Sequence, residues 1–273
     1  MAGTIGRVPM MKHDADPKTT EPLRGGPRSS FCSRLFLNPF YDCLDALSHI
    51  MMGPRTGRAM AAMVVSLIVS WFVYVPIHEI MHAYGCLWTG GSVTELQVDA
   101  KYGAAILKEF FPFVVSGGEY AGRLTGFDTK GSDFCYFMTV FLPFVPTVLL
   151  GVPMLRWCAK RRRSILFGTG IVIGLAPIYQ VWGDYYEMGS ILVTRLLTYF
   201  SGNEKIVYKV VRADDVFRLI GDLFTKRQEL GLQTVGQLFI AYFLVVVCLT
   251  VSILWAFVTY GLGRLFSRAI QRS

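Results

Sequence analysis

The residues His78-Glu79-Ile80-Met81-His82 place two imidazoles and a carboxylate within an apolar stretch of the chain. Residues four positions apart lie on one face of an α-helix, so His78 and His82 can hold one metal ion together. Glu79 lies about 100° further round the helix axis, where it can reach a water molecule beside the ion without being a ligand. Zinc hydrolases divide the work in this way: neutral nitrogens hold the ion and a carboxylate takes a proton from the water.

Chance is a poor explanation of this motif, because the chain has only 4 histidines in 273 residues. The competing interpretation is a helix end that carries two ordinary interfacial histidines. Three ionisable groups at membrane depth are costly unless they serve a function, and this cost favours the metal site.

Composition indicates a membrane protein. Hydrophobic residues make up 53% of the chain, charged residues make up 17%, and the mean hydropathy is +0.44. These values predict an all-α polytopic membrane protein. The net charge of +8 does not indicate nucleic-acid binding, because the Lys and Arg residues lie in the tails and beside apolar stretches, as the positive-inside rule expects.

The apolar stretches predict about four transmembrane helices, at about 58–88, 133–155, 165–182 and 235–262. Pro76 lies just before the motif and is expected to kink the first of these helices. Between the spans, we expect a strand at 93–98, an apolar hairpin arm or shallow re-entrant piece at 104–115, and long loops at 89–132 and 183–234. The second loop is expected to contain an amphipathic surface helix around 216–223.

The chain is expected to have four parts. They are a disordered basic tail at 1–30, an amphipathic interfacial segment at 31–58, a membrane-embedded domain at 59–266 and a basic tail at 267–273.

Basic residues predict the orientation in the membrane. With four spans, one side of the bilayer carries three basic sites: Arg55 with Arg58, the turn 160–163, and the arginines that follow the last span. That side should be cytoplasmic, so both termini are expected in the cytoplasm. The expected location is a bacterial inner membrane, with the motif near the opposite, outer face.

A catalytic zinc site needs a third protein ligand and an open position for water. Asp184 follows the expected third span and reaches the same membrane side and depth as His78 and His82, so it is the first candidate. Glu187, about one helical turn further on, is the second candidate. The competing interpretation is that Asp184 only caps a helix at the interface.

With these residues the chain resembles the site-2 protease family of intramembrane zinc metalloproteases. The resemblance covers roughly residues 59–190, and its specific part is the His-Glu-x-x-His motif. It implies that His78, His82 and Asp184 bind Zn²⁺ and that Glu79 activates water to cleave a peptide bond. The family's aspartate usually lies in Leu-Asp-Gly, whereas this chain has Gly183-Asp184-Tyr185.

The expected function is therefore that of a membrane-embedded zinc metalloendopeptidase. Its partners would be the lipid bilayer and a membrane-associated protein or peptide substrate, while its oligomeric state stays open. Two alternatives come from other classes: a non-enzymatic protein that binds or transports a metal ion, and an assembly factor with a degenerate protease motif. Transport would favour further His, Asp or Glu residues along the spans, and the sequence has almost none there.

Overall fold

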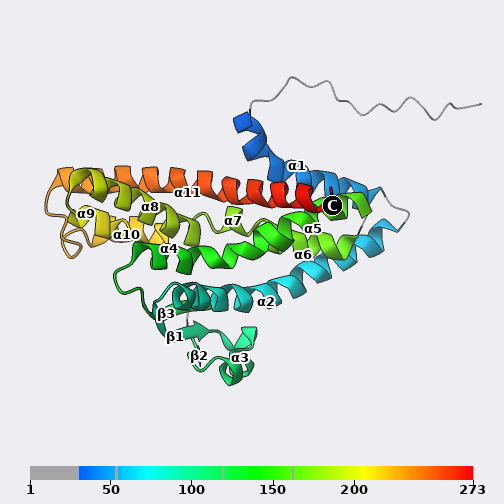
Figure 1. Ribbon diagram of the computed structural model, residues 1–273, viewed down its shortest axis with the longest axis horizontal. Helices are drawn as coiled ribbons and strands as arrows, with labels where there is room; N and C mark the ends of the chain where they lie inside the picture. The colour runs from blue at the N-terminus through cyan, green and yellow to red at the C-terminus, as the bar shows by residue number, and fades with distance from the viewer. Residues whose placement is uncertain (1–30, 53–54, 119, 162, 273) are drawn as a thin grey trace, which may run out of the picture.

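The computed structural model describes residues 31–52, 55–118, 120–161 and 163–272. The expected tail at 1–30 lies outside these residues. Long helices run alongside one another, and a small sheet lies beside the C-terminal half of one of them (Figure 1).

The helix that carries the motif is confirmed. It is α2 (Thr56–Trp88), a helix of 33 residues. Before it comes α1 (Phe31–Met51), the expected amphipathic helix; its position at the membrane surface stays a prediction. After Trp88 the chain turns at Gly90, whose φ of 95° lies in the left-handed region that glycine adopts readily at a helix end.

A three-stranded sheet follows α2, with the strand order β2-β1-β3. The central strand β1 (Ser92–Val98) confirms the predicted strand. It pairs in parallel with β2 (Val114–Ser116) and antiparallel with β3 (Gly122–Asp128).

The expected hairpin arm at 104–115 is wrong, while a shallow re-entrant position of this segment stays a prediction. This segment forms helix α3 (Ala104–Phe110) and leads into β2. The parallel pairing of β1 with β2 explains the helix, because parallel neighbours need a crossover connection and cannot be joined by a tight hairpin. A short 3₁₀ turn, η1 (Ala100–Tyr102), begins this crossover.

The second predicted span is also helical, with two interruptions of its α-helical geometry. It consists of α4 (Asp133–Phe141), the 3₁₀ turn η2 (Leu142–Phe144), the π-helical η3 (Thr147–Gly151) and α5 (Val152–Arg161). Pro143 and Pro146 explain the changes, because proline has no N–H to donate to the carbonyl four residues before it.

The expected span at 165–182 is not confirmed, because no single helix covers it. The structure has α6 (Ser164–Gly174), which has only 11 residues, and the single turn α7 (Ala176–Tyr179). Pro177 lies in the first turn of α7, where its missing N–H is tolerated, but it cannot continue α6. The expected loop from 183 onwards is wrong, because Asp184–Ser201 forms helix α8.

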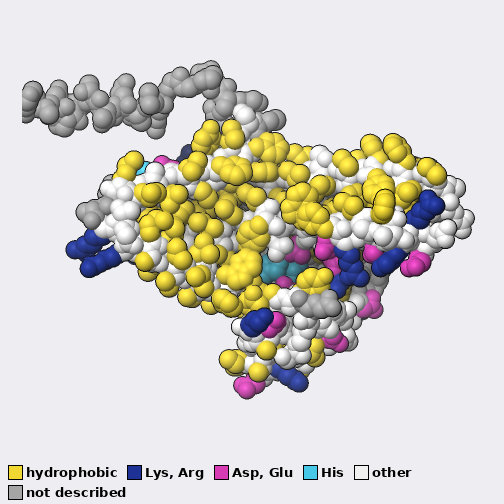
Figure 2. Space-filling model, turned by 180° about the vertical axis from the view of Figure 1, so that it is seen from behind, with side chains coloured by type: hydrophobic (Ala, Val, Ile, Leu, Met, Phe, Trp, Pro, Cys, Tyr) yellow, Lys and Arg dark blue, Asp and Glu magenta, His cyan; other side chains and the backbone are white. Residues whose placement is uncertain are grey.

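Three helical segments of the described residues are long and apolar enough to cross a membrane: Thr56–Trp88, Asp133–Cys158 and Val235–Ile270. The last is α11, which runs past the expected boundary at 266. A fourth span is therefore not confirmed, and the side of the membrane stays a prediction. Apolar side chains cover much of the helical surface in Figure 2.

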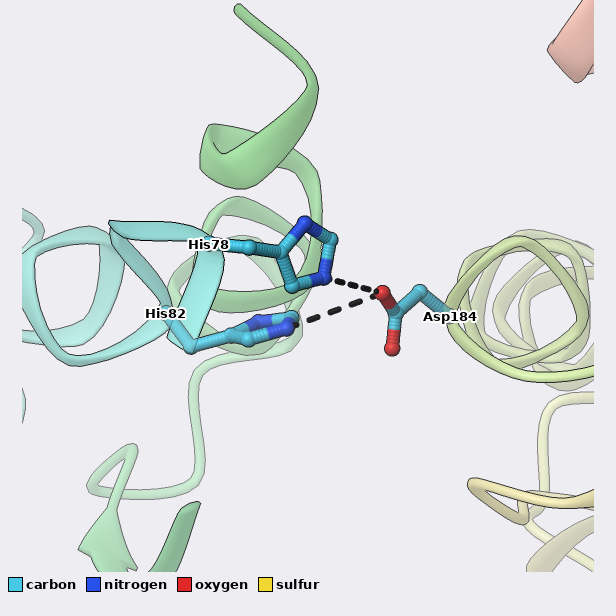
Figure 3. Close-up of side chains that lie close together, drawn as sticks. All are labelled: His78, His82 and Asp184. Atoms are coloured by element: carbon cyan, nitrogen blue, oxygen red, sulfur yellow. Dashed lines mark hydrogen bonds and ion pairs between the residues drawn. The ribbon is translucent and has the colours of Figure 1, made fainter. Parts of the chain in front are cut away.

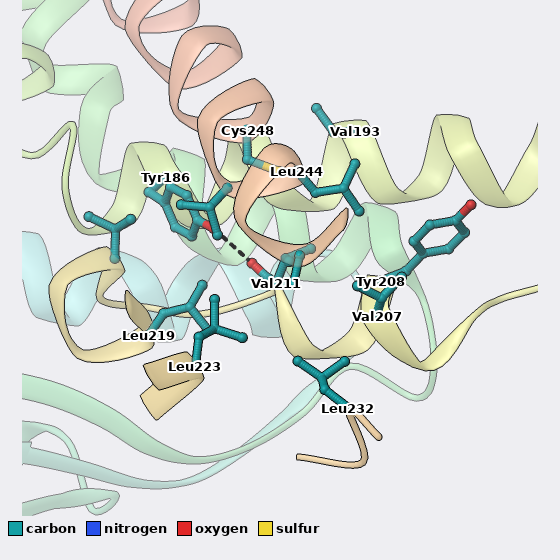
Figure 4. Close-up of a cluster of buried hydrophobic side chains, with 13 residues drawn as sticks. Tyr186, Val193, Val207, Tyr208, Val211, Leu219, Leu223, Leu232, Leu244 and Cys248 are labelled. Atoms are coloured by element: carbon teal, nitrogen blue, oxygen red, sulfur yellow. Dashed lines mark hydrogen bonds between the residues drawn. The ribbon is translucent and has the colours of Figure 1, made fainter. Parts of the chain in front are cut away.

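A buried apolar cluster fixes α8 in place (Figure 4). It joins α8 to α11 and to two short helices, α9 (Ile206–Val210) and α10 (Val216–Thr225). Helix α10 confirms the amphipathic helix predicted around 216–223. Gly189 lets α8 approach α11 closely, because a Cβ there would lie 2.7 Å from the Cys248 carbonyl oxygen. The start of α8 is thus held at a defined place beside α2.

Candidate metal centre

Three of the predicted site residues meet at one point. His78 and His82 extend from α2 towards Asp184, the first residue of α8 (Figure 3). Nε2 of His78 lies 2.9 Å from Oδ2 of Asp184, and Nε2 of His82 lies 3.6 Å from the same oxygen. The ligand atoms of the three residues all lie within 4.8 Å of one another, so the group can hold a metal ion.

The other nitrogen of each imidazole faces a hydrogen-bond partner. Nδ1 of His82 lies 2.9 Å from the carbonyl oxygen of Thr139, and Nδ1 of His78 lies 3.5 Å from the Tyr74 hydroxyl. That hydroxyl donates to the carbonyl of Pro143 at 2.9 Å. A carbonyl can only accept, so Nδ1 of His82 carries a proton, and Nε2 is the nitrogen that can bind a metal ion when the imidazole is neutral. Outer partners of this kind fix the orientation of metal-binding histidines.

Proline makes one of these partners available. In an α-helix, the Thr139 carbonyl would accept a hydrogen bond from the N–H of residue 143. Residue 143 is Pro143, which has no N–H. The Thr139 carbonyl is therefore left for His82. The proline that interrupts the second span thus contributes to the orientation of a histidine on the first.

Asp184 joins the site instead of capping its own helix. The N-cap of α8 is Gly183, and no side chain caps this end. Burial by itself would raise the pKa of Asp184, but the imidazoles of His82 and His78 outweigh it and hold that pKa below its usual range. An ionised carboxylate is the form that binds a metal ion. The competing interpretation of Asp184 as a simple cap is therefore wrong.

Glu79 lies beside the two histidines on the wall of the same cavity. It packs against Gly122, the first residue of β3, and a Cβ at Gly122 would lie only 2.3 Å from Cγ of Glu79. The glycine therefore provides the space that the glutamate side chain occupies. Glu79 and the three residues of the metal group thus line one cavity.

The cavity has a volume of about 830 Å³. Its walls come from α2, β3, α4, the start of α8 and the segment before α10. The space-filling view shows histidine side chains in a hollow between the apolar helical surface and the part that carries the sheet (Figure 2). Such a cavity has room for an extended segment of a polypeptide in front of the metal group.

Glu187, the second candidate for the third ligand, does not join the metal group. It lies one turn after Asp184 and is buried, and its carboxylate accepts a hydrogen bond from the Tyr136 hydroxyl. Burial raises the pKa of Glu187 to about 7. Cys86 also turns away from the histidines, and its thiol faces the carbonyl oxygens of Ser92 and Asp128.

The sequence reasoning missed the residues that orient the histidines. Thr139 acts through its backbone, so its residue type gave no signal. Tyr74 lies four residues before His78, and this spacing is a signal that could have revealed it. Pro143 lies inside the second apolar stretch, where its residue type indicates an interrupted helix and gives no signal of a role beside the histidines.

Comparisons with protein-family models, with curated proteins and with solved structures return no match to this chain. The chemical interpretation therefore rests on the residues themselves. Two imidazoles and one carboxylate form a donor set that suits a catalytic zinc ion, since such sites have three protein ligands and leave one position open. The buried group fits a metal ion by its donors and by its outer hydrogen bonds.

Proposed function

We propose that this protein is a membrane-embedded zinc metalloendopeptidase of the site-2 protease type. The observation that carries the proposal is the convergence of His78, His82 and Asp184 from two helices, with Glu79 beside them in a cavity. A purely structural cluster would not need imidazole tautomers set by outer hydrogen bonds. A degenerate site would not need to keep space for Glu79 at Gly122.

Each residue has a defined role in the proposed hydrolysis. A zinc ion, when bound, would polarise the carbonyl of the peptide bond and make water more acidic. Glu79 takes a proton from the attacking water as the new C–O bond forms. It then gives that proton to the nitrogen as the C–N bond breaks. His78, His82 and Asp184 would hold the zinc ion beside the peptide bond and the water.

The surroundings favour an extended substrate. The site lies between a long apolar helix and a small sheet, at one end of a helix suited to span a membrane. A helical segment hides its peptide bonds in its own hydrogen bonds, whereas an extended or locally unwound one exposes them. We therefore expect cleavage in membrane-associated chains at places where they are not helical.

Metal transport receives little support from the structure. Among the described residues, one group of His, Cys, Asp or Glu side chains could hold a metal ion, and it lies towards one end of α2. A transport path needs ionisable or polar groups at successive depths. An assembly factor without activity stays an alternative that only an assay can separate from the enzyme.

A peptide library tests the proposal without a known substrate. The purified protein in detergent micelles is incubated with synthetic peptides that join an apolar half to a polar half, and new termini are identified by mass spectrometry. We expect cleavage by the wild type, its loss with a zinc chelator, its return with added Zn²⁺ and its loss in Glu79→Gln. Glu95→Gln, a glutamate on β1, serves as the matched control and should cleave normally. Zinc-independent cleavage, or full activity in Glu79→Gln, would overturn the proposed mechanism.

A further inference from the structure

A second polar cluster is buried away from the metal centre, where α1, α5 and α11 meet. Asp42 on α1 accepts a hydrogen bond from the Tyr260 hydroxyl at 3.0 Å. Nε of Arg264 lies 3.3 Å from the same carboxylate oxygen. Arg156 on α5 lies close enough to interact electrostatically with both Asp42 and Arg264. Helices from both ends of the described chain therefore converge on one group of charges.

The charges of this cluster do not balance. Two guanidinium groups face one shielded carboxylate, Asp42, and the neighbouring Asp45 is exposed and pairs with His49, so one positive charge of the shielded group is in excess. Nε and Nη1 of Arg156, and the same two atoms of Arg264, are shielded from solvent and make no hydrogen bond to a described residue. The contact of Arg264 Nε with Asp42 is an ion pair without hydrogen-bond geometry. Buried donors without partners are costly, and a buried charge without a counter-charge is more so. A second anion would remove both costs.

The position of the cluster indicates where that anion comes from. It lies at the end of α11 that also carries Arg268 and Arg272, beyond the apolar stretch of the helix. Apolar side chains beside it face outwards, with exposed fractions of 42% for Trp157 and 58% for Leu265. A ligand here would meet the guanidinium groups of Arg156 and Arg264 together with lipid-facing side chains. Basic pockets between membrane helices bind the headgroups of anionic lipids in this way.

We propose that Arg156 and Arg264 form a binding site for the phosphate group of an anionic phospholipid. Guanidinium groups suit phosphate because their planar donors match its oxygens in pairs. In this site Tyr260 orients Asp42, Asp42 pairs with Arg264, and Arg156 supplies the charge that no shielded carboxylate among the described residues balances. The acyl chains would lie along the exposed apolar residues, and α1 would cover the headgroup. The proposal does not depend on the peptidase function.

Arg156→Gln is the most informative variant, because it leaves the pair of Arg264 with Asp42 balanced. The matched control is Arg268→Gln, which removes the same charge from an exposed position on the same end of α11. Native mass spectrometry and thermal unfolding are measured on full-length protein in nonionic detergent, with phosphatidylglycerol, phosphatidylcholine or inorganic phosphate added. We expect phosphatidylglycerol alone to bind and to raise the unfolding temperature. The affinity for phosphatidylglycerol should fall about tenfold or more in Arg156→Gln, because the loss of a hydrogen bond to a charged group typically changes affinity by that factor. It should stay unchanged in Arg268→Gln.

Three results would overturn the lipid site. One is equal phosphatidylglycerol binding by Arg156→Gln and the wild type. Another is an equal loss in Arg268→Gln, which would indicate general surface attraction. The third is stabilisation by inorganic phosphate as large as that by phosphatidylglycerol, which would assign the site to a free anion. If Arg156→Gln does not fold, Arg156→Lys decides the question: it keeps the charge without the planar fork, so weaker binding supports the site and wild-type binding contradicts it.

Discussion

His82 on α2 is oriented by the backbone of Thr139 on α4: its Nδ1 lies 2.9 Å from the Thr139 carbonyl oxygen. This contact joins the two helices. About one turn further along α2, Gly85 lets the backbones come close, because a Cβ there would lie 2.8 Å from Cα of Thr139. The carbonyl is available because Pro143 cannot donate to it. The metal centre thus depends on the backbone of a helix that contributes no ligand.

Pro143→Ala should weaken metal binding although it does not touch a ligand. The new N–H at residue 143 would compete with His82 for the Thr139 carbonyl. Loss of an outer hydrogen bond to a metal-binding histidine typically costs tenfold or more in affinity, and we expect a loss of about tenfold. Competition for Zn²⁺ with a fluorescent chelator measures the zinc affinity of the variant and of the wild type. Pro146→Ala is the control, because the carbonyl of Leu142 already accepts a hydrogen bond within the helix; equal affinities in both variants would contradict the role of Pro143.

Tyr74→Phe removes the hydroxyl that lies between His78 and the Pro143 carbonyl. Nδ1 of His78 then loses its partner, and we expect zinc affinity to fall by about tenfold. Tyr186→Phe is a matched control, since its buried hydroxyl bonds the Val211 carbonyl in the cluster of Figure 4. Both variants lose a buried hydrogen bond and should lose similar stability, about 1 kcal/mol. Unchanged zinc affinity in Tyr74→Phe would show that the contact does not orient His78.

Gly122→Ala should impair Glu79 without removing the metal ligands. The added Cβ would lie 2.3 Å from Cγ of Glu79, so the glutamate side chain must move. We expect kcat for peptide cleavage to fall about 100-fold, the usual scale for a lost general base, while zinc content stays at the wild-type level. Gly57→Ala is the control, because nothing lies within 4 Å of a Cβ there. A normal kcat in Gly122→Ala would mean that the position of Glu79 does not matter.

The sequence predicted which residues meet at the site better than it predicted the fold around them. The motif has a fixed helical spacing, so the face shared by His78 and His82 could be derived from the chain alone. Asp184 was predicted correctly to meet the two histidines. The element that carries it was predicted wrongly, because Asp184 begins α8 and does not follow the end of a long span. Asp184 meets the histidines whether it ends a span or begins a helix, because the chain comes back beside the motif at this residue.

Helix α8 was missed because it is not uniformly apolar. It contains Asp184, Glu187 and Arg195 among apolar residues, and its buried side faces α11. A search for apolar stretches therefore treats it as a loop. The parallel pairing of β1 with β2 was also beyond prediction, because β2 has only three residues and depends on its neighbour for its structure.

The central claim is that His78, His82 and Asp184 hold one metal ion. The most direct test is the number of zinc ions bound per chain, measured by elemental mass spectrometry after dialysis against a low concentration of Zn²⁺. The account predicts one ion in the wild type, one in Glu187→Gln and Glu79→Gln, and almost none in Asp184→Ala or His78→Ala. Full zinc content in Asp184→Ala together with its loss in Glu187→Gln would contradict the proposed ligand set.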